Sequence, residues 1–334
     1  QVFNVIFRSK APLRIGFAGG GTDVSPYSDQ FGGAILNATI NLYAYASIEE
    51  LGEGKIIMET MDRGEVFVSN WKDELEVDGY LSLHKGVHNR LVRDGHLNGH
   101  GYKLTTYVDA PAGSGLGTSS TLMTTILGAY QEWLNLPFGE YDTAHLAYEI
   151  ERSDLGMAGG KQDQYSATFG GFNFMEFYNE DKVIVNPLRI KEKYANELAH
   201  NLILLYTQTS RESAAIIEMQ RKNVNANNEQ ALEAMHQLKK QAVLMKEALL
   251  KGDMDHIGEI LRFGWDNKKR MAEGITNPMI DDLYRTAMKN GASGGKMFYC
   301  PRNSRHDVVK ALEEKGAKNQ LYQFSKEGLS TWKV

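Results

Sequence analysis

Apolar residues in the first two-thirds of the chain gather in short runs that favour strands. Each run is rich in β-branched or aromatic residues and is bounded by polar residues or glycine. The runs are residues 44–48, 55–60, 65–69, 102–110, 172–177 and 183–188. We expect the last two to form a hairpin.

A period of three to four residues predicts the helices. Leu122, Ile126, Tyr130 and Trp133 would share one face of a helix that follows a glycine-rich turn. Asp142 is the expected N-cap of the next helix. The last third is richer in helix. Its expected elements are strands at 201–207 and 297–300, a long amphipathic helix through Leu232, Met235, Leu238, Met245 and Leu249, and a helix from Pro278 that stops near Gly291.

The order of these elements favours the α+β class and two domains. Strands and helices do not alternate regularly enough for a doubly wound sheet. A chain of 334 residues is long for one domain. The balance of strand and helix changes near residue 190, so the predicted units are 1–190 and 191–334.

Charge and composition exclude several classes of function. Lys and Arg total 37 against 42 for Asp and Glu, without the basic excess of a nucleic-acid binder. One cysteine, Cys300, cannot form an internal disulfide or a multi-cysteine metal site. No apolar run is long enough to span a membrane. We therefore expect a cytoplasmic protein with neither nucleic-acid nor membrane partners. The clustered histidines 84, 88, 96 and 100 are expected on the surface and not as ligands.

The strongest local signal is the glycine-rich string PAGSGLGTSS at 111–120. Its glycines let the backbone approach a ligand, and the following helix start adds N–H groups and a positive dipole end. The predicted phosphate-binding residues are Pro111, Gly113, Ser114, Gly115, Leu116, Gly117, Thr118, Ser119 and Ser120. The alternative is a turn whose Ser and Thr residues only cap the helix.

Two rival phosphate motifs do not fit. A Walker loop requires a lysine that residues 111–120 lack, and GASGGK at 291–296 has the wrong glycine spacing. A dinucleotide fingerprint requires a third glycine, which the string after Gly117 does not supply.

Two further clusters carry polar chemistry. Residues 11–23, APLRIGFAGGGTD, end in Asp23, whose carboxylate can accept hydrogen bonds from two sugar hydroxyls or form an Asx turn. Residues 149–171 carry Glu149 and Glu151, which point about 200° apart on a helix. Only one of these two carboxylates can face a site.

Together the three strings resemble the motifs of the GHMP kinases, the family of galactokinase, homoserine kinase, mevalonate kinase and phosphomevalonate kinase. Residues 11–23 resemble the first motif, APGRxxLxGEHTD, and residues 111–121 the second, PxxxGLGSSAA. Residues 159–171, GGKQDQYSATFGG, resemble GxxDQxxxxxGG. The resemblance implies an N-terminal domain like domain 2 of ribosomal protein S5 and a ferredoxin-like C-terminal domain.

The resemblance also implies roles for individual residues, with ATP and Mg²⁺ as cofactors. Asp163 would be the catalytic carboxylate, and Arg14 would neutralise charge near the transferred phosphoryl group. Ser119 and Glu151 would ligate magnesium. The expected sugar-binding residues are Gly19, Gly20, Gly21, Thr22 and Asp23.

Within the family, the strings at 17–23, 149–174 and 209–214 are most similar to kinases of D-glycero-D-manno-heptose 7-phosphate. These phosphorylate the anomeric hydroxyl to a 1,7-bisphosphate for nucleotide-activated heptose and surface polysaccharide. A sugar phosphate substrate requires cations, and we assign Lys161 and Arg211 to its site. The full set of candidates is Lys10, Lys161, Arg211, Arg262, Lys268 and Lys269. The alternatives are an L-fucose or galactose kinase, or a non-catalytic sensor; the presence of Asp163 and Glu151 favours catalysis.

The family's third motif, KxxGAGGGG before an apolar strand, is incomplete. GASGGK at 291–296 runs directly into MFYC, about eight residues short of the pattern. Either the natural protein has further residues between Lys296 and Met297, which we favour, or the loop is absent from this chain.

Overall fold

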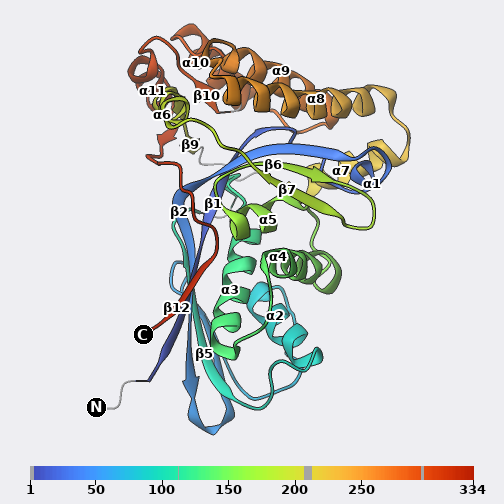
Figure 1. Ribbon diagram of the computed structural model, residues 1–334, viewed down its shortest axis with the longest axis vertical. Coiled ribbons are helices and arrows are strands. Elements are labelled where there is room, and N and C mark those ends of the chain that lie inside the picture. Colours follow the sequence, from blue (N-terminus) through green and yellow to red (C-terminus); the bar gives the residue numbers. More distant parts are fainter. Residues whose placement is uncertain (1–3, 112, 207–212, 295–296) are drawn as a thin grey trace.

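A computed structural model describes residues 4–111, 113–206, 213–294 and 297–334. The molecule is elongated, with a long sheet along one side and a group of helices at one end (Figure 1). No helix in these ranges is long and apolar enough to cross a membrane.

The large sheet has the strand order β12-β1-β2-β5-β3-β4. Its strands pair in antiparallel fashion except β3 with β5. The N-terminal end of β2, residues 33–38, also pairs with β6, which forms the expected hairpin with β7. The bounds are β1 Ile6–Ala18, β2 Gly33–Leu51, β3 Lys55–Thr60, β4 Glu65–Asn70, β5 Gly101–Val108, β6 Phe172–Phe177, β7 Val183–Pro187 and β12 Ser330–Lys333.

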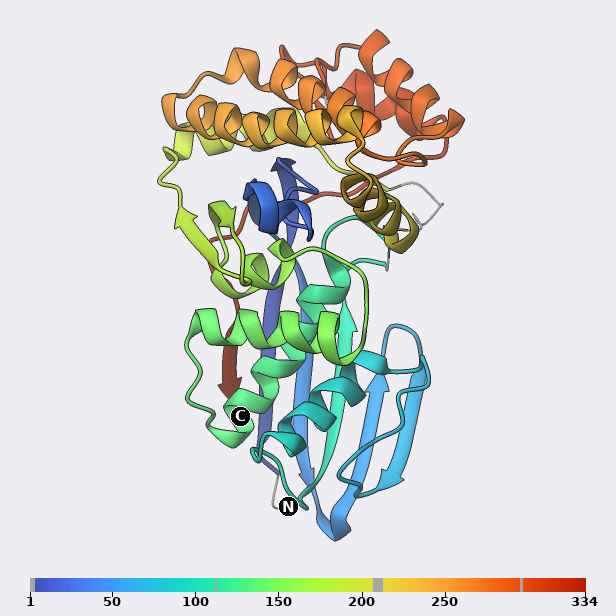
Figure 2. The same cartoon turned by 90° about the vertical axis from the view of Figure 1, so that its right-hand side faces the viewer.

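Helices cover one face of this sheet, as the view in Figure 2 shows. They are α2 Ser82–Arg93, α3 Thr118–Leu134, α4 Glu140–Glu149 and α5 Gln162–Phe169, with a π-helical turn at Ile150–Asp154. Helix α3 is buried from Ser120 to Tyr130, because it lies between the sheet and the other helices. Its apolar side chains pack with Ile48 and Leu104 of the strands in the main core.

The remaining helices gather at one end of the molecule, at the top of the view in Figure 2. They are α6 Glu192–Asn201, α7 Ser213–Asn225, α8 Glu229–Lys251, α9 Ile257–Met271, α10 Pro278–Lys289 and α11 Arg305–Glu313; the short α1 is Tyr27–Phe31. Two small sheets join them, β8 Leu202–Ile203 with β10 Phe298–Tyr299, and β9 Leu205–Tyr206 with β11 Lys318–Asn319.

The end of the chain returns to the large sheet. Residues 323–325 hydrogen-bond to Asn41 and Thr39 of β2, and β12 pairs with β1. Strand β12 thus pairs with the first predicted unit although it lies in the second. The division at residue 190 stays a prediction.

Two local expectations were wrong, and a third is confirmed only in part. Helix α4 begins at Glu140, and Asp142 is its third residue, whose carboxylate accepts the Gly139 N–H at 3.0 Å. The expected strand at 201–207 is reduced to β8 and β9 within the described residues. His84 and His88 are buried and not on the surface, because β5 supplies them with partners: Thr106 for His84 and Tyr102 for His88.

Candidate active site

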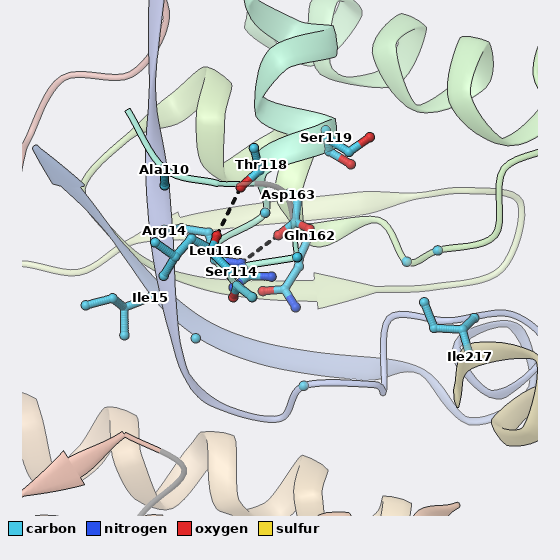
Figure 3. Close-up of a pocket in the computed structure, with 18 of the residues that line it drawn as sticks. Arg14, Ile15, Ala110, Ser114, Leu116, Thr118, Ser119, Gln162, Asp163 and Ile217 are labelled. Carbon is cyan, nitrogen blue, oxygen red and sulfur yellow. Dashed lines mark hydrogen bonds and ion pairs between the residues drawn. The ribbon is translucent and has the colours of Figure 1, made fainter. Parts of the chain in front are cut away.

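A cavity of about 1100 Å³ lies between the sheet and the C-terminal helices. Its walls come from β1, the glycine loop 19–21, the loop before α3, the segment 151–163 and helices α7 to α9. All nine predicted phosphate-binding residues line it. Figure 3 shows part of this lining, with Arg14, Asp163 and the loop of Ser114 and Leu116 close together.

The predicted phosphate loop ends at the first residue of α3, Thr118. Gly117 has φ +74°, and a Cβ there would lie 2.9 Å from the carboxyl carbon of Asp163. Glycine is therefore required both for the turn and for the close approach of Asp163. The free N–H groups of the first turn of α3 and its dipole make this end of the cavity suitable for an anion.

Arg14 connects the phosphate loop to Asp163. Its Nε donates to Asp163 Oδ1 at 2.6 Å (Figure 3), and its Nη1 donates to the Gly115 carbonyl at 2.7 Å. Both side chains line the cavity. The guanidinium therefore brings positive charge to the place where a phosphoryl group on the loop would face the carboxylate.

Asp23 fixes the start of the helix that carries Asp163. Its Oδ2 accepts the N–H of Lys161 at 2.7 Å and of Gln162, the first residue of α5, at 3.0 Å. A Cβ on Gly160 would lie 2.0 Å from the same oxygen, so only glycine fits there. Asp23 also lines the cavity, where a sugar hydroxyl could reach its carboxylate. Its contact with the sugar stays a prediction.

Glu151 is buried in the cavity wall, on the π-helical turn that follows α4. It accepts hydrogen bonds from the Ser120 hydroxyl at 3.2 Å and from Gln164 Nε2 at 3.0 Å. Burial raises its pKa, and the nearby Arg152 opposes this effect. Glu149 instead pairs with Arg90 at 2.9 Å, which confirms that only one of the two carboxylates faces the site.

The oxygens beside Glu151 suit a hard divalent cation. The Gln164 side chain contacts the buried carboxylate and the Ser120 hydroxyl through its Nε2, and its Oε1 is buried without a hydrogen-bond partner in the structure. Across the described ranges no three His, Cys, Asp or Glu side chains gather as a metal cage. A single carboxylate plus hydroxyls is typical of Mg²⁺ that is shared with substrate phosphates. The hydroxyl that contacts Glu151 belongs to Ser120, and both Ser119 and Ser120 line the cavity.

Another part of the cavity reaches the turn between β3 and β4 and the start of α2. Thr60, Arg63, Gly79 and His84 line it. Lys85 holds the adjoining loop through an ion pair with Asp78 at 3.0 Å. This region could not be predicted from the sequence, because it has no motif and its residues meet only when β3, β4 and α2 pack together.

The glycine loop 19–21 is enclosed by the C-terminal helices. Gln220 of α7 donates to the Gly21 carbonyl at 2.6 Å, and Gln241 of α8 accepts the Gly19 N–H at 3.2 Å. Lys268 of α9 lies against Gly20. Sequence reasoning missed both glutamines; their only signal was a polar residue on an apolar helix face.

Two of the predicted substrate residues lie away from the cavity. Thr22 is fully buried, and its hydroxyl donates to the Gly19 carbonyl at 2.8 Å, so it shapes the loop. The Lys161 side chain is buried beside Asp181, with 3.1 Å between Nζ and Oδ1, and it does not line the cavity. Arg211 lies outside the described residues.

Comparisons with known proteins agree with this arrangement. The description "GHMP kinases N terminal domain" matches residues 82–171, and "GHMP kinases C terminal" matches residues 245–298. The D-glycero-alpha-D-manno-heptose 7-phosphate kinase of Campylobacter jejuni is 44% identical over 98% of this chain and 99% of its own length.

Solved structures give the same result. A D-glycero-D-manno-heptose 1-phosphate kinase from Bacteroides thetaiotaomicron has 46% identity and a TM-score of 0.83, covering 98% of this chain and 99% of its own. Lactococcus lactis galactokinase, at 18% identity and a TM-score of 0.76 over 97% of this chain and 95% of its own, shares the fold. These similarities confirm the predicted α+β fold and the two GHMP domains, and the chain belongs to the GHMP kinases.

Proposed function

We propose that this protein transfers the γ-phosphoryl group of ATP to the anomeric hydroxyl of D-glycero-D-manno-heptose 7-phosphate. The observation that carries the proposal is the meeting of three groups in one cavity: the glycine-rich loop before α3, the Arg14–Asp163 pair and buried Glu151. The identity of the sugar is supported by the Campylobacter jejuni relative, a kinase that is 44% identical.

The loop 113–117 and the first turn of α3 bind the phosphates of ATP in this proposal. Their N–H groups and the helix dipole stabilise the anionic chain without a lysine in the loop. The part of the cavity beside Arg63 and His84 leaves room for the nucleoside. Binding of ATP there aims its γ-phosphate at Arg14.

Asp163 orients the attacking hydroxyl and accepts its proton. A bond forms between the sugar oxygen and the γ-phosphorus, while the bond from that phosphorus to the β–γ bridging oxygen breaks and ADP leaves. Arg14 offsets the charge that develops on the transferred group, and its contact with Gly115 keeps loop and carboxylate in register. Most of the catalytic effect is then positioning and charge stabilisation.

Glu151, with the Ser119 and Ser120 hydroxyls, would hold the magnesium ion. When bound, Mg²⁺ neutralises charge on the β- and γ-phosphates. Gln164 keeps both Ser120 and Glu151 in place through its Nε2, at 3.2 and 3.0 Å.

The names of the two heptose kinases differ in the position of the phosphate that the substrate already carries. A 7-phosphate phosphorylated at O1 and a 1-phosphate phosphorylated at O7 give the same 1,7-bisphosphate. Product analysis therefore cannot separate them, but substrate choice can. We favour the 7-phosphate, and we propose that the bisphosphate enters nucleotide-activated heptose and surface polysaccharide synthesis in the cytoplasm.

The test is magnesium-dependent ADP release with a panel of sugars. The panel contains heptose 7-phosphate, heptose 1-phosphate, free heptose, mannose 6-phosphate, L-fucose and galactose. We expect turnover on heptose 7-phosphate. Turnover on heptose 1-phosphate alone would reverse the regiochemistry, and turnover on a free sugar alone would make the protein a free-sugar kinase. ATP binding without any turnover would favour a sensor.

A further inference from the structure

Four Arg or Lys side chains line the cavity among the residues that the structure describes: Arg14, Arg63, Arg152 and Lys268. The first three belong to the sheet side. Arg14 contacts Asp163, Arg63 lies 3.5 Å from Glu65, and Arg152 donates to the Gly160 carbonyl at 2.9 Å. Within the described part of α7, α8 and α9, Lys268 is the cavity-lining cation.

The geometry of α9 directs Lys268 to the glycine loop. Leu261, Gly264, Trp265, Lys268 and Met271 line the cavity at helical spacing, so they form one face of the helix. A Cβ built on Gly20 would lie 3.2 Å from the Lys268 Nζ. The ammonium group thus lies directly over the loop that we assign to the sugar.

Of the other cations that the sequence suggested for a substrate phosphate, the four that the structure describes, Lys10, Lys161, Arg262 and Lys269, do not line the cavity. Lys10 lies over the Tyr43 ring at 4.5 Å, and Lys161 faces Asp181. Lys269 lies 3.7 Å from Asp266. Among the candidates that the structure describes, position therefore selects Lys268.

A sugar phosphate poses an electrostatic problem in this cavity. The walls already carry Asp23, Glu151 and Asp163, and ATP brings further negative charge. A phosphate monoester with nearly two negative charges needs a cation to offset that repulsion, and an ammonium group with three donors on a flexible stem is a common phosphate ligand.

We propose that Lys268 binds the phosphate that the sugar substrate already carries, the group that is not transferred. The inference rests on the proposed function and extends it by assigning a subsite for a phosphate monoester. The sugar then lies over the glycine loop, with its reacting hydroxyl at Asp163 and its phosphate at α9. Lys268 is a specificity-determining residue, and it explains how the enzyme prefers a phosphorylated sugar over the free sugar.

The test compares Lys268→Met with Lys269→Met. Both changes remove one positive charge from the same turn of α9, but Lys269 is not among the cavity-lining residues. For Lys268→Met we expect the KM for heptose 7-phosphate to rise about 10- to 100-fold, as the loss of a charge-assisted contact implies. The KM for ATP and the kcat on free heptose should change less than about threefold. Lys269→Met should behave as wild type, and Lys268→Arg should recover part of the affinity.

The decisive quantity is the ratio of kcat/KM for phosphorylated and free heptose. A ratio that is the same in wild type and Lys268→Met overturns the subsite while leaving the kinase intact. Calorimetric titration of heptose 7-phosphate with ATP omitted measures the same preference without turnover. There, equal affinity of wild type and Lys268→Met, or no binding to wild type, also overturns it. Unchanged ATP binding by Lys268→Met verifies that the variant is folded. Failure of the wild type to phosphorylate any sugar counts against the proposed function instead.

Discussion

The wall of the cavity on the side of the large sheet differs in construction from the wall formed by α7, α8 and α9. On the sheet side, charged groups are fixed by several contacts each: Arg14 touches Asp163 and Gly115, and Glu151 touches Ser120 and Gln164. On the helix side, single side chains such as Gln220 and Lys268 reach over a glycine loop. The first construction suits chemistry that tolerates no displacement, and the second suits recognition of a particular sugar.

This comparison predicts that changes on the sheet side affect turnover or magnesium use, and changes on the helix side affect the KM for the sugar. The largest effect is expected at Asp163. Asp163→Asn should lower kcat by about 10²- to 10⁴-fold, because the amide cannot accept the proton of the attacking hydroxyl. ATP affinity, measured by calorimetry, should be retained. A kcat close to wild type would remove Asp163 from the mechanism and undo the comparison.

A smaller effect is expected at Gln164, which contacts the proposed magnesium ligands but does not line the cavity. Gln164→Met should raise the Mg²⁺ concentration for half-maximal velocity about 10- to 100-fold, as the loss of a residue that orients a metal ligand does. The KM for the sugar should stay near wild type. If the sugar KM rose and the magnesium requirement did not, Gln164 would belong to recognition and not to the metal site.

His84 tests the sheet side through pH. Burial, with the charges of Arg63 and Lys85, lowers its pKa from 6.5 to about 3. Between these two pKa values the unfolded chain binds a proton at His84 and the folded protein does not. The contribution of neutral His84 to stability is therefore fully present above pH 6.5 and is lost as the pH falls toward 3.

Lowering the pH from 7.5 to 5 should reduce the unfolding free energy of wild type by about 2 kcal/mol more than that of His84→Gln. Denaturant titrations at the two pH values give this difference. A difference that does not change with pH would show that His84 is not held neutral by the fold.

The smallest effect is expected on the helix side, at Gln220. Gln220→Leu removes the bond to the Gly21 carbonyl, a neutral hydrogen bond at 2.6 Å, and should raise the KM for the sugar about fivefold. The magnesium requirement should not change. A fall in kcat with the sugar KM unchanged would mean that the glycine loop serves chemistry more than recognition, which would weaken the contrast between the two walls.

The sheet side was easier to predict from the sequence, because its functional residues lie in short sequence motifs. Within each motif the residues keep their spacing whatever the rest of the fold is. The side-chain direction within a string was harder to predict. Ser119 and Ser120 differ by about 100° on a helix, and only the latter contacts Glu151. Lys161 is two residues from Asp163 yet points to Asp181.

The helix side could not be predicted, because its residues meet the glycine loop only through tertiary packing. A helical pattern identifies an apolar face, but it does not show which loop that face covers. The sequence favoured Lys161 and Arg211 over Lys268 among six candidate cations, and the position of Lys268 became visible only when α9 was placed against Gly20. His84 and His88 were misplaced for the same reason, since their partners Thr106 and Tyr102 lie on β5.

The incomplete third motif stays open. Residues 295–296 lie outside the described ranges, so the structure does not test the two interpretations. The alignment with the Campylobacter jejuni kinase spans 337 positions, more than the 334 residues of this chain. The relative therefore has residues with no counterpart here.

The return of the chain to β1 has a consequence for biosynthesis. Residues 323–334 hydrogen-bond to Asn41, Thr39 and β1. The ribosome releases them after the C-terminal helices, so the large sheet is synthesised early but its last strand is added late. Until then one edge of β1 carries unpaired backbone groups that can bind another nascent chain. Deleting these residues would therefore destabilise the sheet around β1 and β2, which is synthesised first and lies far in sequence from the deletion.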